Sequence, residues 1–413
     1  MAIPSGPVWH PFTQHATDPA PPRITRTEAQ FLFAGDRRIL DAVSSWWVVT
    51  HGHRHPAIMA AIRDTAERLD QVIFAGLTHE PAEALAEALV SLAPAGLNHV
   101  FFSDSGSTAV EVALKMALGY WHHSGQPRGR IVVMEHSYHG DTIGTMSVGE
   151  RRVFNAAYGP LMFDVDQIPF PGNGDTLAAF EALCQRGNIA ALIVEPLVLG
   201  AGGMLIYGPE VLTGLRAVCD RHGVLLIADE VMTGWGRTGT LWACGQAGVA
   251  PDILCTSKGL TGGAIPLAAT LATGAIFDAH YSSDRSRTFF HSSSYTANPI
   301  ACAAALANIG IWQDEPVQAR INALTAMQAE RLATFADDPR FANLRQCGTI
   351  AALDLAGGTG YMAEDGPRLR AHFLDRDLLI RPLGSSIYLL PPYCVTGDDL
   401  DRCYAAIRDY NRP

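Results

Sequence analysis

The sequence predicts an α/β protein with a large domain on a mainly parallel sheet and a smaller α+β domain. The middle of the chain alternates short apolar, β-branched runs with segments of helical periodicity, which is typical of βαβ units. These runs are apolar throughout, as expected for parallel strands that helices cover on both faces. With 413 residues, the chain also exceeds the size at which one hydrophobic core keeps growing.

The expected elements follow this division. Helices should open at Pro56 and Pro81, since proline is favoured at the first helical position. A third helix should cover 105–122, and strands are expected at 99–103, 131–134, 190–194, 224–228 and 253–256. Beyond about residue 310 we expect a long helix at 316–335, strands near 349–355, 378–381 and 387–390, and a closing helix at 398–410. The predicted division is an N-terminal segment, 1–55, that contributes to the small domain, a large domain, 56–310, and the small α+β domain, 311–413.

Composition argues against several kinds of partner. The chain has 30 basic and 41 acidic residues, a formal charge of −11, which argues against a nucleic-acid or acidic-membrane surface. Its eight cysteines form no C-x-x-C pair, and no stretch resembles a secretory leader or a membrane span. We therefore expect a cytoplasmic protein with reduced thiols. His51, His53 and His55 alternate, but no carboxylate or cysteine completes a zinc site, so no metal is expected.

One apolar strand ends in Asp229 and Glu230, ahead of the glycine-rich loop TGWGRTG. In open parallel sheets, ligands bind beyond the carboxyl ends of the strands. A fixed carboxylate there would suit pyridoxal phosphate, whose pyridine nitrogen must stay protonated for the cofactor to act as an electron sink. Read alone, such a pair is more often a helix cap or a surface pair.

Lys258 follows a second buried strand, in ILCTSKGLTGG, one crossover connection after Asp229. Such a crossover brings both side chains to the same edge of the sheet. A desolvated lysine can form an imine with the cofactor aldehyde, and its neutral amine can move a proton between substrate and cofactor. On its own, a lysine in this setting is more often solvated.

Residues 105–108, within SDSGSTAVEVALKMA, lie at a strand-to-helix turn. Backbone N–H groups at a helix start bind anions, and a glycine permits close approach. Gly106 and Ser107 are therefore the candidates for a phosphate site, although a simple N-cap is the commoner role of such a turn. In EHSYHGDTIGTMSV, Tyr138 could stack on a flat heteroaromatic ring or be an ordinary half-buried aromatic, and Asp141 could orient groups nearby.

In this order and spacing, the motifs resemble the class III aminotransferases of fold type I over essentially the whole chain. The segments that carry the resemblance are WHPFT, SSWW, DSGS, YHGDT, EPLVLGAGGM, ADEVMTGWGRTG, SKGLTGG, SYTANP and IRPLGSSIYLLPPY. The ADE, lysine and glycine-rich segments are family-wide. WHP, SSWW and IRP with LPPY are similar to the members that act in biotin synthesis.

The resemblance implies pyridoxal 5'-phosphate as cofactor, with Lys258 as the Schiff-base lysine and Asp229 as the partner of the pyridine nitrogen. It makes Tyr138 the residue that covers the ring, and Gly106 with Ser107 the phosphate ligands. It further implies a homodimer with shared active sites, in which the residues that reach the phosphate of the neighbouring subunit are Ser293 and Ser294.

The resemblance also implies the substrates, S-adenosylmethionine as amino donor and 7-keto-8-aminopelargonate as acceptor. The substrate-contacting positions are Phe12, Trp46, Tyr138, Ser292 and Arg381, and Arg237 lies in a segment that lines the same cavity. A guanidinium at the end of an apolar channel could hold the acceptor's carboxylate by a two-point contact. The alternatives are a surface arginine at 381 and core packing of Trp46 and Trp47, which otherwise suit an apolar wall.

Two departures from the subfamily keep other functions open. Phe12 stands where many members that use S-adenosylmethionine have tyrosine, and Leu199 stands where glutamine is common. Lysine as donor and a broad ω-aminotransferase therefore remain alternatives. A nicotinamide-binding protein or a non-catalytic module is a more distant one, because GAGGM at 200–204 follows Glu195-Pro196 and does not open a helix after the first strand.

Overall fold

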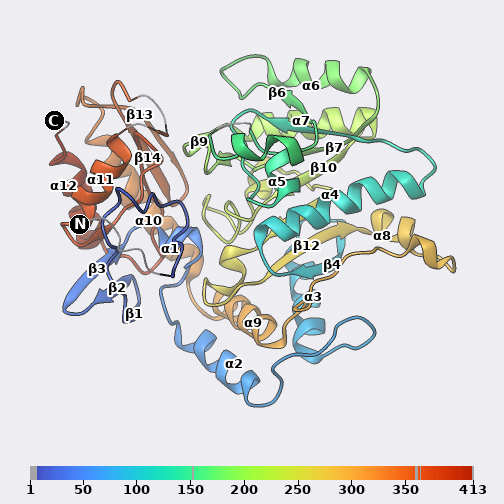
Figure 1. The fold of residues 1–413 in the computed structure, drawn as a ribbon, viewed down its shortest axis with the longest axis horizontal. Coiled ribbons are helices and arrows are strands. Elements are labelled where there is room, and N and C mark those ends of the chain that lie inside the picture. Colours follow the sequence, from blue (N-terminus) through green and yellow to red (C-terminus); the bar gives the residue numbers. More distant parts are fainter. Residues whose placement is uncertain (1–6, 151–152, 359–360, 363, 412–413) are drawn as a thin grey trace.

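The computed structural model describes residues 7–150, 153–358, 361–362 and 364–411. Figure 1 shows a large part, coloured from cyan to yellow, beside a smaller part in which N-terminal blue and C-terminal red elements lie together. This arrangement brings distant segments of the chain to the boundary between the two parts.

The large part is built on a seven-stranded sheet with the order β4-β12-β11-β10-β7-β5-β6. Its strands are β4 (Leu97–Ser103), β5 (Arg130–Met134), β6 (Asp166–Ile168), β7 (Ile189–Val194), β10 (Leu225–Asp229), β11 (Ile253–Thr256) and β12 (Ala268–Thr273). β12 runs antiparallel to both of its neighbours, and the other pairs are parallel. The prediction of an α/β fold on a mainly parallel sheet is confirmed.

Helices cover both faces of this sheet because successive strand residues point to opposite sides. On β10, Leu225 and Ile227 pack with α4 (Gly106–His123), whereas Leu226 and Ala228 pack with α6 (Thr176–Gln185) and α7 (Pro209–His222). The other helices of this part are α2 (Pro56–Ala66), α3 (Glu80–Leu92), α5 (Ile143–Ser147), α8 (Gly274–His280) and α9 (Pro299–Asp314). A short hairpin joins β8 (Val198–Leu199) to β9 (Leu205–Ile206), and the 3-10 turns are η1 (Ala156–Leu161), η2 (Ala243–Ala247), η3 (Lys258–Thr261) and η4 (Arg285–Arg287).

The smaller part combines both ends of the chain. One sheet has the order β1-β2-β3-β15, so that β1 (Arg26–Glu28), β2 (Phe31–Ala34) and β3 (Arg37–Asp41) join β15 (Leu378–Leu379). A second sheet has the order β13-β14-β16, formed by Phe341–Cys347, Ile350–Leu355 and Ser386–Leu389. Its helices are α10 (Val317–Ala333), α11 (Asp365–Leu374) and α12 (Gly397–Arg408), and the turn α1 (Ser44–Trp47) links it to the large part. The domain boundaries at 55/56 and 310/311 remain a prediction.

Most predicted elements are present, and several observed elements were not foreseen, among them β12 and α9. The strand AATLAT of β12 is composed of small residues and threonines, which lack the strong apolar signal of its neighbours. Helix α9 is apolar on every face because it is buried on several sides, so that it shows no helical periodicity. The helix expected from Pro81 begins one residue earlier, at Glu80.

Two further findings concern membrane-spanning helices and the cysteines. In the portion of the chain that is described, no helix is long and apolar enough to cross a membrane. All eight cysteines are free thiols, and six of them are buried.

Candidate active site

Asp229 and Lys258 lie at the same edge of the central sheet. Asp229 is the last residue of β10, and the parallel pairing of β10 with β11 places it beside Cys255. Lys258 begins η3, two residues beyond the end of β11. The crossover expected from the sequence therefore brings the two side chains to one site.

Lys258 is held in a setting that favours its neutral amine. Burial lowers the pKa of Lys258, against the opposing effect of the Asp229 and Glu195 carboxylates. Its Nζ lies 5.1 Å from the ring centroid of Trp47, and its backbone has a φ of 44°, in the left-handed region. A neutral amine is the form that attacks an aldehyde and that accepts a proton.

Asp229 has a partner that the sequence analysis did not assign. His139 Nδ1 lies 2.7 Å from Asp229 Oδ2, and the Val231 N–H donates to Asp229 Oδ1 at 3.1 Å. The His139 side chain is fully buried, and its Nε2 has no hydrogen-bond partner among the residues that the structure describes. Its place directly after Tyr138 in YHGDT was the available signal. The pair keeps the carboxylate oriented in the site.

Glu195 is a second group that the sequence analysis left without a role. Its carboxylate accepts the N–H of Tyr138 at 3.0 Å and the N–H of Gly200 at 2.9 Å, which ties two loops of the site together. Burial raises the pKa of Glu195 to about 7. It therefore contributes to both the shape and the charge of the site.

The start of α4 meets the loop around Gly140. Ser105 caps the helix by a capping box with Thr108, so its hydroxyl is already engaged. A Cβ at Gly106 would lie 2.6 Å from Val231 Cγ1, and a Cβ at Gly140 would lie 2.1 Å from Ser107 Oγ. Only glycines fit these two positions without displacement. The capping box engages the Thr108 N–H, so the N–H groups of Gly106 and Ser107, at the start of this 18-residue helix, are the ones that an anion could meet.

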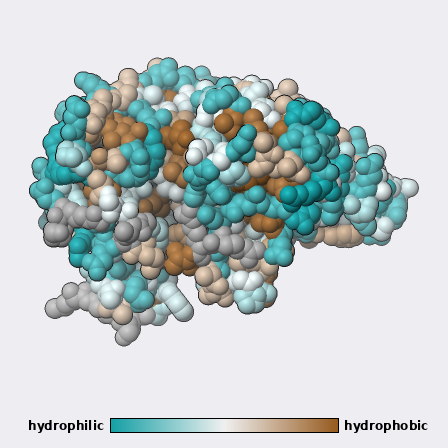
Figure 2. Space-filling view, turned by 90° about the horizontal axis from the view of Figure 1, so that it is seen from above, coloured by the Kyte–Doolittle hydropathy of each residue, from teal (hydrophilic) through white to brown (hydrophobic). Residues whose placement is uncertain are grey.

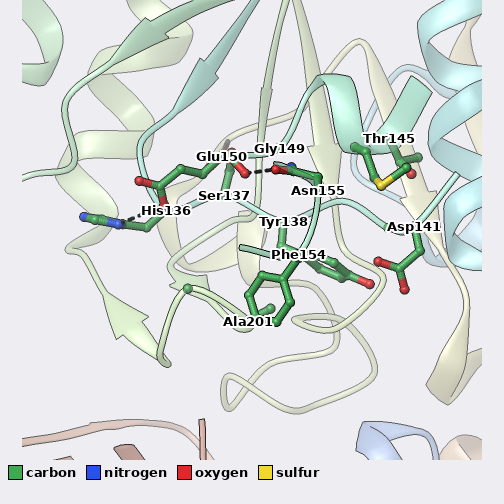
Figure 3. A pocket seen from close by; sticks show the side chains of 13 residues that line it. His136, Ser137, Tyr138, Asp141, Thr145, Gly149, Glu150, Phe154, Asn155 and Ala201 are labelled. Atoms are coloured by element: carbon green, nitrogen blue, oxygen red, sulfur yellow. Dashed lines mark hydrogen bonds and ion pairs between the residues drawn. The ribbon is translucent and has the colours of Figure 1, made fainter. Parts of the chain in front are cut away.

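Tyr138 is half-buried beside the same loops. Burial, followed by the charge of Asp141, raises the pKa of Tyr138 above its usual value, and in Figure 3 its hydroxyl points toward that carboxylate. A cavity of about 30 Å³ lies against Tyr138 and Phe154 (Figure 3). A space of this size holds about one water molecule beside the ring.

Three of the predicted substrate positions come together at the boundary of the two parts. The Phe12 and Trp46 rings meet edge to face at 5.5 Å, and the Arg381 guanidinium lies 4.8 Å from the Trp46 ring centroid. Arg381 Nη2 also donates to Phe12 O at 3.4 Å. Arg381 is half-buried, and Trp46 is 40% exposed. The three residues form an apolar wall that ends in one cation.

The two adjacent tryptophans have different surroundings. Trp47 is 5% exposed, and its Nε1 donates to the Tyr388 hydroxyl at 3.0 Å. It packs in the core and also presents its ring to Lys258. The sequence left open whether the two tryptophans pack in the core or line an apolar wall. Trp47 packs in the core against Lys258, and Trp46 lies at the surface beside Arg381.

The Arg237 side chain is buried and held by backbone carbonyls. It is 1% exposed, and its guanidinium donates to the carbonyl oxygens of Trp47, Val49 and Pro391. Backbone carbonyls engage Nη1 and Nη2, whereas Nε has no hydrogen-bond partner among the described residues, so the expectation that its segment lines the substrate cavity stays a prediction. Leu199, the other departure noted in the sequence, is likewise buried in the core.

Ser292, Ser293 and Ser294 lie in a surface segment. The Ser292 and Ser294 side chains are exposed, and Gln71 Nε2 donates to Ser294 O at 2.7 Å. These serines do not join the Asp229 and Lys258 cluster through any hydrogen bond of the described chain. Their predicted role in the neighbouring subunit stays a prediction.

Neither of the remaining sequence alternatives gains support. The three alternating histidines take separate partners, which are Asn308 for His51, Asp41 for His53 and Glu315 for His55. Within the described ranges, no group of three or more histidine, cysteine or acidic side chains is arranged to hold a metal ion. The GAGGM segment forms the turn between β8 and β9 and does not open a helix, which argues against a dinucleotide fingerprint.

Comparison with known proteins places this geometry in a family. The family described as Aminotransferase class-III matches residues 12–410. The chain is 48% identical to adenosylmethionine-8-amino-7-oxononanoate aminotransferase of Synechococcus elongatus, over 98% of this chain and 99% of that protein. It superposes on the crystal structure of the enzyme of that name from Methanocaldococcus jannaschii with a TM-score of 0.94, at 31% identity, over 98% of this chain and 97% of the other.

A second solved structure is also similar to this chain, but it is named for a different activity. It is an amine transaminase from an uncultivated Pseudomonas species in its PLP-bound form, with a TM-score of 0.91 and 34% identity, over 98% of each chain. Because the family match spans nearly the whole chain and the sheet-edge lysine and aspartate lie together, the protein belongs to the class III aminotransferases.

Proposed function

We propose that this chain transfers the amino group of S-adenosylmethionine to 7-keto-8-aminopelargonate, giving 7,8-diaminopelargonate in biotin biosynthesis. The observation that carries the proposal is the wall of Phe12 and Trp46 that ends in Arg381, within a chain 48% identical to an aminotransferase named for this reaction. A long apolar acceptor with a distal carboxylate matches such a wall.

Pyridoxal phosphate, when bound, supplies an aldehyde that condenses with primary amines and a ring that withdraws electrons. The open N–H groups beside Gly106, with the Ser107 hydroxyl, would hold its phosphate. Asp229, oriented by His139, would hold the ring nitrogen protonated. These residues fit the cofactor by charge and by the space that the glycines leave.

Lys258 and Tyr138 would carry the remaining steps at the reacting carbon. The Lys258 amine, whose pKa burial lowers, would take up and return a proton in each half of the reaction. Tyr138, whose hydroxyl stays protonated because its pKa is raised, would cover the ring and donate a hydrogen bond. Glu195 would keep the Tyr138 loop in place through its bond to the backbone.

One experiment distinguishes S-adenosylmethionine from lysine as the amino donor, and it also distinguishes the proposed reaction from that of a broad ω-aminotransferase. In a half-reaction assay, the spectrum of the loaded enzyme is followed after addition of S-adenosylmethionine, lysine or a simple terminal amine. Conversion by S-adenosylmethionine, with conversion back by 7-keto-8-aminopelargonate, supports the proposal. Preference for a simple amine would favour a broad ω-aminotransferase, which the amine transaminase at 34% identity makes the second candidate.

We also propose a cytoplasmic homodimer. Large apolar side chains stand exposed next to the predicted trans-acting serines: Ile73 is 64% exposed and Tyr295 is 63% exposed, and the Gln71 bond to Ser294 joins their segments. Figure 2 shows one face of the molecule, on which hydrophobic patches reach the surface between hydrophilic ones. Burying these side chains against a second copy would favour dimerisation. Sedimentation at micromolar concentration tests the assembly.

A further inference from the structure

Four consecutive residues without glycine adopt the left-handed conformation beside the site. Ser44, Ser45, Trp46 and Trp47 have φ values of 51°, 45°, 69° and 74°. L-residues adopt this region singly at a cost, and a run of four persists only where the surroundings impose it. The run therefore has a physical cause elsewhere in the structure.

The Asp41 carboxylate is the principal restraint on this turn. Its side chain is fully buried. Oδ1 accepts the N–H of Ser45 at 2.9 Å, and Oδ2 accepts the Ser45 hydroxyl at 2.7 Å. Oδ2 also lies 2.8 Å from Nε2 of His53. A buried carboxylate whose oxygens are all engaged fixes the groups that donate to it.

The same strand pair carries both halves of the proposed acceptor wall. Asp41 ends β3 and pairs in register with Leu379 of β15, which lies two residues before Arg381. On the other side, Ser44 Oγ donates to Leu390 O at 2.7 Å. The turn that carries Trp46 and the strand that leads to Arg381 are therefore both anchored to the pairing of β3 with β15.

The left-handed run determines where the two tryptophans point. Trp46 reaches the surface beside Arg381, whereas Trp47 faces Lys258 from the core. A right-handed turn would redirect both indoles, because side-chain direction follows the backbone conformation. Trp46 thereby gains its contact with Arg381 only while the left-handed conformation holds.

We propose that Asp41 is a positioning residue that sets acceptor specificity by holding the left-handed turn, so that Trp46 forms the wall between Lys258 and Arg381. This inference rests on the proposed function, because the acceptor is the substrate whose chain the wall would contact. It assigns Asp41 and its partner His53 no contact with substrate or cofactor.

The test uses the holoenzyme with Asp41→Asn, which keeps the shape and removes the charge. We expect the KM for 7-keto-8-aminopelargonate to rise about tenfold, while kcat changes less than about threefold, because uniform binding is lost and the reacting groups are untouched. Adding Ser45→Gly should bring KM back to within about threefold of the wild type, since glycine adopts positive φ without a Cβ penalty.

A spectroscopic readout is independent of turnover. The chain has seven tryptophans, so 5-fluorotryptophan gives resolvable 19F resonances that Trp46→Phe and Trp47→Phe assign. Asp41→Asn should shift the Trp46 and Trp47 resonances and leave in place that of Trp121, which lies near the end of α4 and donates to Ala190 O. Glu181→Gln is the matched control, because it removes a carboxylate that pairs with His222 on α6 and α7.

The outcomes separate the inference from the function on which it rests. An Asp41→Asn enzyme with unchanged acceptor KM and unchanged Trp46 resonance would overturn the positioning role while wild-type turnover still supports the reaction. A wild-type enzyme that does not use 7-keto-8-aminopelargonate would overturn the proposed function, and the fluorine spectra would still report on the turn. If Asp41→Asn does not fold, Ser45→Ala, which removes one bond to Asp41, provides the same test on the Trp46 resonance.

Discussion

The two halves of the candidate site are built in different ways. In the cofactor half, Gly106, Asp229 and Lys258 lie at or just beyond the carboxyl ends of strands β4, β10 and β11 of the central sheet. In the substrate half, Phe12, Trp46 and Arg381 come from segments that are far apart in the chain. They contact one another, and the pairing of β3 with β15 brings the segments of Trp46 and Arg381 together. The first half depends on sheet register, and the second depends on tertiary contacts.

This difference suggests how function is divided. A group at the ends of packed strands is fixed by the most stable part of the fold, so it suits chemistry that both half-reactions share. A wall assembled from loops can change its shape without disturbing the sheet, so it suits substrate choice. Changes in the cofactor half should therefore affect both half-reactions, and changes in the wall should affect one substrate.

The largest effect is expected for Lys258→Ala. Loss of the amine removes both the covalent anchor and the proton carrier, so turnover should fall by at least the roughly 10²–10⁴-fold of a positioned acid–base group. Steady-state rates with both substrates measure the loss. Because the chain has only two lysines, Lys115 and Lys258, borohydride reduction followed by peptide mass analysis identifies the one that binds the cofactor.

Lys115→Ala is the matched control for this prediction. Lys115 lies on α4 and donates to Phe290 O at 2.7 Å, outside the Asp229 cluster. Its loss should leave turnover within about threefold of the wild type, because it removes a surface contact. Labelling of Lys115 in the reduced protein, or normal turnover by Lys258→Ala, would contradict the cofactor half as described.

Asp229→Asn is expected to have the next largest effect. It keeps the shape next to His139 and removes the charge that would hold the ring nitrogen protonated, so both half-reactions should slow by about 10²–10³-fold. Single-turnover spectra at saturating cofactor measure this rate. Asp252→Asn, which changes a carboxylate at the opposite end of β11, should alter stability and not the single-turnover rate. Equal slowing by both variants would argue against an electronic role.

Arg381→Ala tests the comparison further, because it should weaken binding of the acceptor and leave the reaction with the donor nearly unchanged. A hydrogen-bonded contact to a charged group is worth about 1.5–3 kcal/mol, so the acceptor KM should rise roughly ten- to hundredfold. The rate of the donor half-reaction should stay within about threefold. An acceptor analogue without the carboxylate supplies the control, because wild type and variant should bind it equally. A variant that discriminates between the two acceptors as wild type does would exclude the carboxylate contact.

The same division explains what the sequence could predict. Asp229 and Lys258 were identified because each directly follows an apolar run, and parallel pairing then fixes their shared edge. His139 and Glu195 were missed because their roles depend on loops that meet only in three dimensions. Arg237 has the residue type of a substrate ligand, but its two terminal nitrogens donate to backbone carbonyls, and no local pattern reveals these contacts.

The left-handed turn lay beyond sequence reasoning for a related reason. SSWW contains no glycine, and propensity alone gives such a stretch no reason to adopt positive φ. The conformation results from Asp41, Leu390 and Tyr388, two of which lie more than 300 positions away in the chain. Tertiary contacts thus override local preference in the half of the site that selects the substrate.

Phe12→Tyr should have the smallest effect, and it tests the donor side of the wall. Phe12 is 42% exposed and contacts the Trp46 and Phe154 rings at 5.5 and 6.1 Å. Aromatic faces of this kind attract a sulfonium cation whether or not a hydroxyl is present. One added hydrogen bond is worth about 0.5–1.5 kcal/mol, so kcat/KM for S-adenosylmethionine should improve by roughly two- to tenfold.

Stopped-flow spectra of the donor half-reaction measure this change, with Phe277→Tyr as control because Phe277 is 44% exposed on α8 and does not contact the wall. Lysine should convert both the wild type and Phe12→Tyr poorly. An improvement far above tenfold would mean that the hydroxyl, and not the aromatic wall, is the main determinant of donor binding. Efficient conversion by lysine with none by S-adenosylmethionine would overturn the donor and leave the cofactor half intact, because that half acts on any primary amine that reaches Lys258.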